Sequence, residues 1–217
     1  MYLEIESSIK RYFSLFSNLL IKFMYSSIKQ TILSYIPFLS DKELKVIEKN
    51  FSYRELKKGE YFLKAGDVVT EVAYINKGLF RNFIRYDDGS EKNTNFSIEG
   101  AFSCDRRSYH LRTPSEESIQ ALEDSQILVI TLEQIEEMYR KYRVFERASR
   151  LITQLYRIKQ SMQIRWFIEK SAEKRYDTFV ENYPELVNRV PQYMIASYLG
   201  ITPESLSRLI AKNKKKA

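Results

Sequence analysis

The chain has 217 residues, 44% of them hydrophobic and 29% charged, which excludes a disordered or membrane-embedded protein and fits one large domain or two small ones. A single cysteine, Cys104, and a single histidine, His110, exclude a disulfide within the chain and metal sites built on several thiolates or imidazoles, and they favour a cytoplasmic location. The net charge of +7 lies entirely in residues 133–217, which carry 17 Lys and Arg against 10 Asp and Glu, so we expect a nucleic acid or an anionic membrane surface as partner.

The first segment, residues 1–24, is interpreted as an N-terminal extension, and Met24 is a second possible start. Its apolar stretch, Tyr12 to Tyr25, is interrupted by Ser14, Asn18 and Lys22, so it falls short of the roughly 20 apolar residues of a membrane span. Acidic residues stand where a secretory signal needs positive charge. We therefore expect neither a membrane span nor a secretory signal.

Residues 25–132 are predicted to form a β-roll preceded by two short helices. Apolar residues recur at helical spacing between residues 26 and 50, with a break at Pro37 and a new start capped by Ser40. Glycines then follow at intervals of 7, 12, 11 and 11 residues from Gly59 to Gly100, and Asp88-Gly89 marks a tight hairpin. The regular spacing of these glycines indicates many short antiparallel strands. The predicted fold class is therefore α+β with a cupin-like or jelly-roll sheet.

Residues 133–165 are predicted to form a connecting helix that dimerises. Its apolar positions alternate in steps of three and four, which is typical of a coiled-coil seam; they are Ala148, Leu151, Leu155, Ile158 and Met162. The alternative is that the helix packs on its own sheet, because short patterns of this kind are common in globular helices. Trp166 and Phe167 follow, and we interpret them as core residues of a small helical domain over residues 166–217.

The segment from Gln192 to Leu209 predicts a helix-turn-helix. Ala196 allows a close helix crossing, Gly200 can adopt the left-handed conformation that ends the first helix, and Thr202 can cap the second helix ahead of Pro203. An ordinary helical hairpin is the alternative. We favour DNA binding because these residue types occur together at matching offsets.

The exposed side of the second helix carries the candidate DNA-binding residues. Arg208 can donate two hydrogen bonds to a guanine edge, and Glu204 can accept one from a cytosine amino group. The lysines that follow either extend the positive strip or form a solvated end. The full candidate set is Thr202, Pro203, Glu204, Ser205, Ser207, Arg208 and Lys212.

The order of these parts resembles the CRP/FNR family of transcription regulators from about Tyr25 onwards. The stretches that carry the resemblance are Leu56–Asp67, Ala73–Glu91, Ser118–Ile130 and the helix-turn-helix. The resemblance implies a sensory β-roll and a homodimer that binds a near-palindromic operator on double-stranded DNA, with RNA polymerase as a further partner. It matches Glu204 and Arg208 to base-contacting positions. By the same resemblance, we expect the β-hairpin wing that usually follows the recognition helix to be truncated or absent.

The effector pocket departs from the cyclic-nucleotide-binding members of the family. The family's glycine–glutamate pair, which holds the ribose, corresponds to Gly100-Ala101-Phe102, and two acids follow Ser115 where an arginine neutralises the phosphate. Cyclic AMP is therefore not expected, although Arg106, Arg107 and Arg112 are an alternative source of positive charge. No cofactor is expected, and the lone Cys104 and His110 are interpreted as structural.

These observations favour a homodimeric DNA-binding transcription regulator that is not an enzyme and does not bind a membrane. The alternative is a regulatory module whose β-roll binds a small molecule and acts through protein contacts. A cupin-type enzyme has little support, because one histidine cannot supply the clustered metal ligands that such enzymes use.

Overall fold

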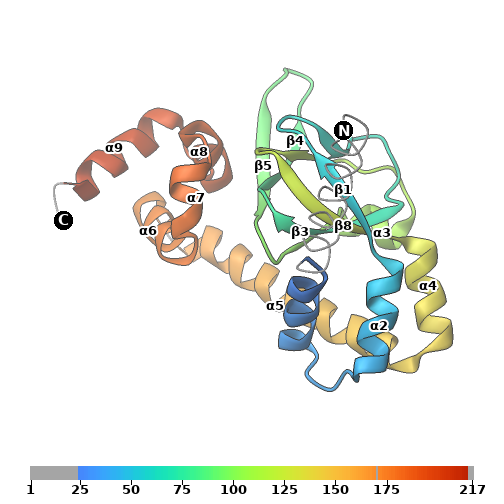
Figure 1. Cartoon of the computed structure of the whole chain (residues 1–217). Coiled ribbons are helices and arrows are strands. Elements are labelled where there is room, and N and C mark those ends of the chain that lie inside the picture. Colours follow the sequence, from blue (N-terminus) through green and yellow to red (C-terminus); the bar gives the residue numbers. More distant parts are fainter. Residues whose placement is uncertain (1–23, 170, 215–217) are drawn as a thin grey trace, which may run out of the picture.

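The computed structural model describes residues 24–169 and 171–214. A β-roll and a bundle of C-terminal helices lie at the two ends of one long helix, and the N-terminal helices gather beside the roll at the start of that long helix (Figure 1). The expected extension over residues 1–24 lies outside the described residues except for Met24. Met24 is completely buried in the apolar cluster beside the roll.

Two helices precede the strands, as predicted. Residues 24–35 are helical, and α2 spans Asp41–Asn50. The Ser40 hydroxyl accepts a hydrogen bond from the Glu43 N–H, and the Glu43 carboxylate accepts one from the Ser40 N–H at 2.7 Å. This reciprocal pair is a capping box, and it fixes where α2 begins.

The β-roll consists of two four-stranded antiparallel sheets, which confirms the predicted fold class. One sheet has the order β1-β8-β3-β6 and the other β2-β7-β4-β5. A short helix, α3 (Arg106–Leu111), follows β6. The strands are β1 (Ser52–Leu56), β2 (Tyr61–Leu63), β3 (Glu71–Lys77), β4 (Phe80–Arg85), β5 (Glu91–Ser97), β6 (Phe102–Ser103), β7 (Ser118–Ala121) and β8 (Ser125–Thr131).

Side chains of β3 and β8 alternate between the interior of the roll and its outer face, as the period of two in a strand requires. Ala73 and Ile127 lie in the interior cluster, whereas Tyr74 and Leu128 lie in a second cluster outside the roll. The outer cluster is covered by the N-terminal helices and the long helix. Both faces of the sheet β1-β8-β3-β6 are therefore buried.

The predicted connecting helix over residues 133–165 is in fact two helices. The first, α4 (Leu132–Lys141), is capped by Thr131 and ends at Tyr142, whose backbone is extended at φ −141° and ψ 102°. The second, α5 (Arg143–Glu169), has 27 residues. Met138 before the break and Phe145 after it both lie in the outer apolar cluster. The division into domains otherwise remains a prediction.

Four helices follow α5: α6 (Ala172–Asn182), α7 (Pro184–Arg189), α8 (Gln192–Leu199) and α9 (Pro203–Lys214). Phe179, Ala196 and Leu206 are almost completely buried in their core. As predicted, Trp166 and Phe167 contribute to this core, where both rings contact Tyr198. Among the residues described, no helix is both long and apolar enough to cross a bilayer.

Candidate nucleic-acid interface

The turn between α8 and α9 depends on the glycine that the sequence analysis singled out. Gly200 has φ +67° and ψ +38°, which is the left-handed conformation. Its N–H and that of Ile201 bond to the last carbonyls of α8, the latter to the Ala196 oxygen at 3.0 Å. A side chain at residue 200 would strain this conformation, so the sharp exit from α8 requires glycine.

Thr202 begins α9 as its cap. The Thr202 hydroxyl accepts a hydrogen bond from the Ser205 N–H at 3.2 Å, and Pro203 occupies the first helical position. Leu206, one turn later, is completely buried against α8. The Thr202 cap and the buried Leu206 side chain together fix the direction of α9.

The structure separates the candidate DNA-binding residues into two groups. Pro203, Glu204, Ser207 and Arg208 are exposed on α9, which lies at the end of the molecule farthest from the roll (Figure 1). Ser205, by contrast, is half-buried and bonded to the Thr202 hydroxyl at 3.1 Å. The remaining candidate, Lys212, forms an ion pair with a carboxylate of α6.

Two further contacts define the charges on this face. Lys212 is exposed, and its ammonium lies 2.9 Å from the Glu173 carboxylate of α6. Hydrogen bonds from its own backbone N–H and from Thr202 lower the pKa of Glu204, so this carboxylate is charged at neutral pH. The Arg208 side chain donates a long hydrogen bond, 3.4 Å, to the Glu204 carbonyl. The face therefore offers one guanidinium donor and one carboxylate acceptor next to each other.

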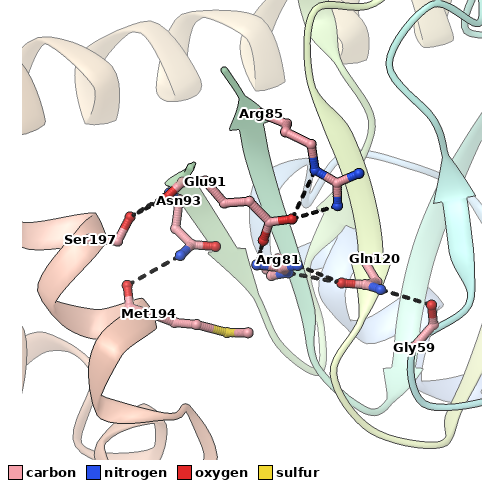
Figure 2. A network of polar contacts seen from close by, with 8 residues as sticks. All are labelled: Gly59, Arg81, Arg85, Glu91, Asn93, Gln120, Met194 and Ser197. Carbon is pink, nitrogen blue, oxygen red and sulfur yellow. Dashed lines mark hydrogen bonds and ion pairs between the residues drawn. The ribbon is translucent and has the colours of Figure 1, made fainter. Parts of the chain in front are cut away.

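The helix-turn-helix is docked on the β-roll through α8 and β5 (Figure 2). The Ser197 hydroxyl accepts a hydrogen bond from the Asn93 N–H at 3.0 Å and donates one to the Glu91 carbonyl at 3.1 Å. The Asn93 amide donates to the Met194 carbonyl at 3.4 Å. Side chains from the roll, among them Leu79 and Phe96, lie in the same apolar cluster as α8.

A second contact between the roll and the helices is centred on Arg189 at the end of α7. Its guanidinium bonds both oxygens of Glu99 at 2.9 Å and both oxygens of Glu123 at 2.8–3.0 Å. Burial alone would raise the pKa of Glu99, but the bonds from Arg189 and from the Gly78 N–H outweigh it and lower the pKa. The charged form of Glu99 is thus the form that holds the helices to the roll.

The ion pair between Arg189 and Glu99 makes the docking of the C-terminal helices on the β-roll dependent on pH. Because the pKa of Glu99 is lower in the docked state, its contribution is complete at neutral pH and is lost as the pH falls through that pKa. In an Arg189→Met variant we expect the Glu99 pKa to rise, as measured by NMR titration of its carboxyl carbon. The control is Lys212→Met, which removes an ion pair elsewhere, and an identical Glu99 pKa in both variants would contradict the assignment.

The predicted dimer seam is only partly available on α5. Ala148 is buried in the apolar cluster of its own chain, so it is not part of an exposed seam, and Leu151 is half-buried. Leu155, Ile158 and Met162 are exposed by 46%, 58% and 67%. The first two turns of α5 pack against the roll, and an apolar stripe is left free further along the helix.

The four candidate effector residues are divided among different surroundings. Gly100 and Ala101 line a cavity of about 260 Å³ with Tyr156 of α5. Phe102 lies on the outer face of the roll, with its ring centroid 5.2 Å from that of Tyr74. Ser115 is buried, and its hydroxyl donates to Asp105 at 2.7 Å. The described residues therefore do not bring these four together into one pocket.

Charge near Ser115 is negative. Asp105 is buried, the Glu117 carboxylate accepts a bond from the Asn82 amide at 3.2 Å, and the exposed Glu116 is paired with Arg107. Within the described ranges, no group of three or more His, Cys, Asp and Glu side chains is placed to hold a metal ion. Burial raises the pKa of Cys104 to about 11, so the thiol remains neutral at physiological pH.

Sequence reasoning missed the residues that dock the helices on the roll. Asn93 and Ser197 are 104 positions apart, and Glu99 and Arg189 are 90 apart. Nothing in the local pattern around them distinguishes them from other polar surface residues. The signal that identifies them is their burial and bonding in the folded chain.

Known proteins resemble this chain both in sequence and in fold. The model of the cyclic nucleotide-binding domain matches residues 53–142. The transcriptional activator protein anr of Pseudomonas aeruginosa is 27% identical over 175 residues, which are 73% of this chain and 69% of that protein. The fumarate and nitrate reduction regulatory protein of Escherichia coli K12 is 27% identical over 197 residues, covering 83% of this chain and 76% of the relative.

Solved structures share the fold. FixK2 from Bradyrhizobium japonicum superposes with a TM-score of 0.65 at 16% identity, covering 76% of this chain and 85% of FixK2. A structure from Eubacterium rectale, described as a regulator of the crp/fnr family, superposes with a TM-score of 0.61 at 20% identity and covers 82% of this chain and 85% of its own. At these identities the likeness concerns the fold alone.

Proposed function

We propose that the chain is a transcription regulator of the CRP/FNR type and acts as a homodimer whose two α9 helices bind the half-sites of a near-palindromic DNA operator. In such a dimer the recognition helices lie about 34 Å apart, one turn of the duplex. The excess of positive charge in residues 133–217 favours association with the phosphate backbone. The cytoplasm is the proposed location.

The observation that carries this proposal is the exposed pair Glu204 and Arg208 on a helix whose start and direction are fixed. An operator base needs a donor or acceptor that is pre-positioned and free of competing partners. Arg208 is exposed and its bond to the Glu204 carbonyl is long, and Glu204 is charged. Pro203 and Ser207 lie on the same exposed side and are proposed to contact the backbone or bases. RNA polymerase is proposed as a further partner.

The β-roll is proposed to lack cyclic-nucleotide binding. Asp105, Glu116 and Glu117 surround the position where a cyclic phosphate would need a cation. Of the three arginines that could substitute, Arg107 is paired with Glu116 and Arg112 with Glu136. An anionic phosphate would be repelled by this arrangement.

An Arg208→Ala variant is expected to lose about 1–3 kcal/mol of operator-binding free energy and to relax the preference at one base pair. The measurement is fluorescence anisotropy against the operator and a set of single-base variants of it. The matched control is Lys212→Ala, which removes a cation paired with Glu173 and should leave the preference at every base pair unchanged. Equal operator affinity and selectivity of Arg208→Ala and wild type would refute the role of Arg208.

A further inference from the structure

A cavity of about 410 Å³ lies outside the β-roll. It is an open cavity lined by the outer face of the sheet β1-β8-β3-β6 and by the helix over residues 24–35, α2, α3, α4 and α5, which gather there in Figure 1. Phe102 and Ile130 line it from the sheet and Met138 from α4. The interior of the roll, where Ala73 and Ile127 pack, is a separate cluster.

The walls of this cavity are largely apolar, which sets the first requirement for an occupant. Its volume is in the range of about 300–1,000 Å³ that small-molecule sites have. Apolar side chains around such a volume favour an occupant whose surface is also apolar.

One side of the cavity carries positive charge without a balancing carboxylate. Arg106 and Arg157 line it, and no Asp or Glu is among the lining residues. Within residues 24–169 and 171–214, neither arginine forms an ion pair with a described carboxylate. The Cys104 thiol and the Tyr156 phenol also line the cavity, and both remain neutral because burial raises their pKa.

Arg106 is also held in place. It is half-buried at the start of α3, and its guanidinium carbon lies 3.2 Å from the centroid of the Tyr156 ring on α5. Stacking on an aromatic ring orients the guanidinium plane and leaves its N–H edge available to an anion. The site thus combines an apolar volume with one positioned cation.

We propose that this cavity binds a fatty carboxylate, with the carboxylate group on Arg106 and the hydrocarbon chain against Phe102, Ile130 and Met138. The binding itself does not depend on the proposed DNA-binding function. A regulatory effect does rest on that function, because the occupant would touch Ile152 and Tyr156 on the same helix that carries the exposed stripe Leu155–Met162.

The test is isothermal titration calorimetry of the full-length protein with decanoate and with decanol, which has the same chain length but no charge. We expect saturable binding of decanoate, and in an Arg106→Gln variant a loss of about 10- to 100-fold in decanoate affinity, as expected for removing a charge-assisted bond. Decanol affinity should be the same in both proteins. Thermal unfolding of the variant, with and without decanol, shows that the fold and the apolar volume are retained.

The control variant is Arg107→Gln, which changes the neighbouring arginine that is paired with Glu116 and does not line the cavity. It should bind decanoate as wild type does. Absence of saturable decanoate binding to the folded wild-type protein, or equal losses in the two variants, would overturn the proposal. Operator binding is measured separately, so a protein that binds decanoate but no DNA would count against the proposed function alone.

Discussion

An Ile158→Glu variant is expected to be monomeric at concentrations where the wild-type protein forms the proposed homodimer. Ile158 is 58% exposed on α5 between Leu155 and Met162, so its burial in a symmetric seam would occur twice per dimer. Burying an isoleucine contributes about 1.5–3 kcal/mol, so the loss over two copies corresponds to a dissociation constant raised by at least about 100-fold. Sedimentation equilibrium measures it, and operator affinity should fall with it because only the dimer binds both half-sites.

The chain offers a matched control for this prediction. Ile164 lies on the same helix and is 61% exposed, but six residues further along it faces a different side of α5. An Ile164→Glu variant should therefore remain a dimer. If both variants are dimeric, or both are monomeric, the assignment of the seam to the face of Ile158 is incorrect.

An Arg81→Met variant is expected to lower the free energy of unfolding by about 1.5–3 kcal/mol, because it removes a buried guanidinium that bonds Gln120 and the half-buried Glu91 carboxylate. Arg81 is 5% exposed, lies 2.7 Å from the Glu91 carboxylate and bonds Gln120, which in turn donates to the Gly59 carbonyl (Figure 2). Burial alone would raise the pKa of Glu91, but bonds from Arg85 and Arg81 lower it. Chemical denaturation at pH 7 measures the loss.

The control for Arg81 contacts the same carboxylate. Arg85 also pairs with Glu91, but its side chain is 58% exposed, so Arg85→Met should cost less than about 1 kcal/mol. Adding Glu91→Gln to Arg81→Met should recover part of the loss, since it removes a half-buried charge whose remaining partner is the exposed Arg85. Equal losses for Arg81→Met and Arg85→Met would show that burial of the network does not matter.

Local features of this protein were predictable from the sequence because local chemistry determines them. Gly200 is required by the left-handed end of α8, Thr202 caps α9, and Ser40 caps α2. The strand-rich region and its hairpin at Gly89 followed from regular glycines, and the Gly89 N–H indeed bonds the Tyr86 carbonyl at 2.9 Å. Each of these signals lies within a few residues of the structure that it predicts.

Features set by packing between distant segments were not predictable. The break at Tyr142 lies in a stretch without Pro or Gly, so no residue type marks it in the sequence. Docking of the helices on the roll joins Ser197 to Asn93 and Arg189 to Glu99, and no local pattern encodes such pairs. Ala148 was expected in the dimer seam because its spacing matches, but spacing cannot tell which stretch of an apolar stripe the chain itself covers.

The most direct test of the central claim is selection of bound fragments from randomised double-stranded DNA by the purified full-length protein, followed by footprinting. The account predicts enrichment of a near-palindrome whose half-sites are centred about one helical turn apart, with loss of the preferred base at one position per half-site in the Arg208→Ala variant. Recovery of fragments without any shared sequence, at an affinity equal to that for random DNA, would contradict it.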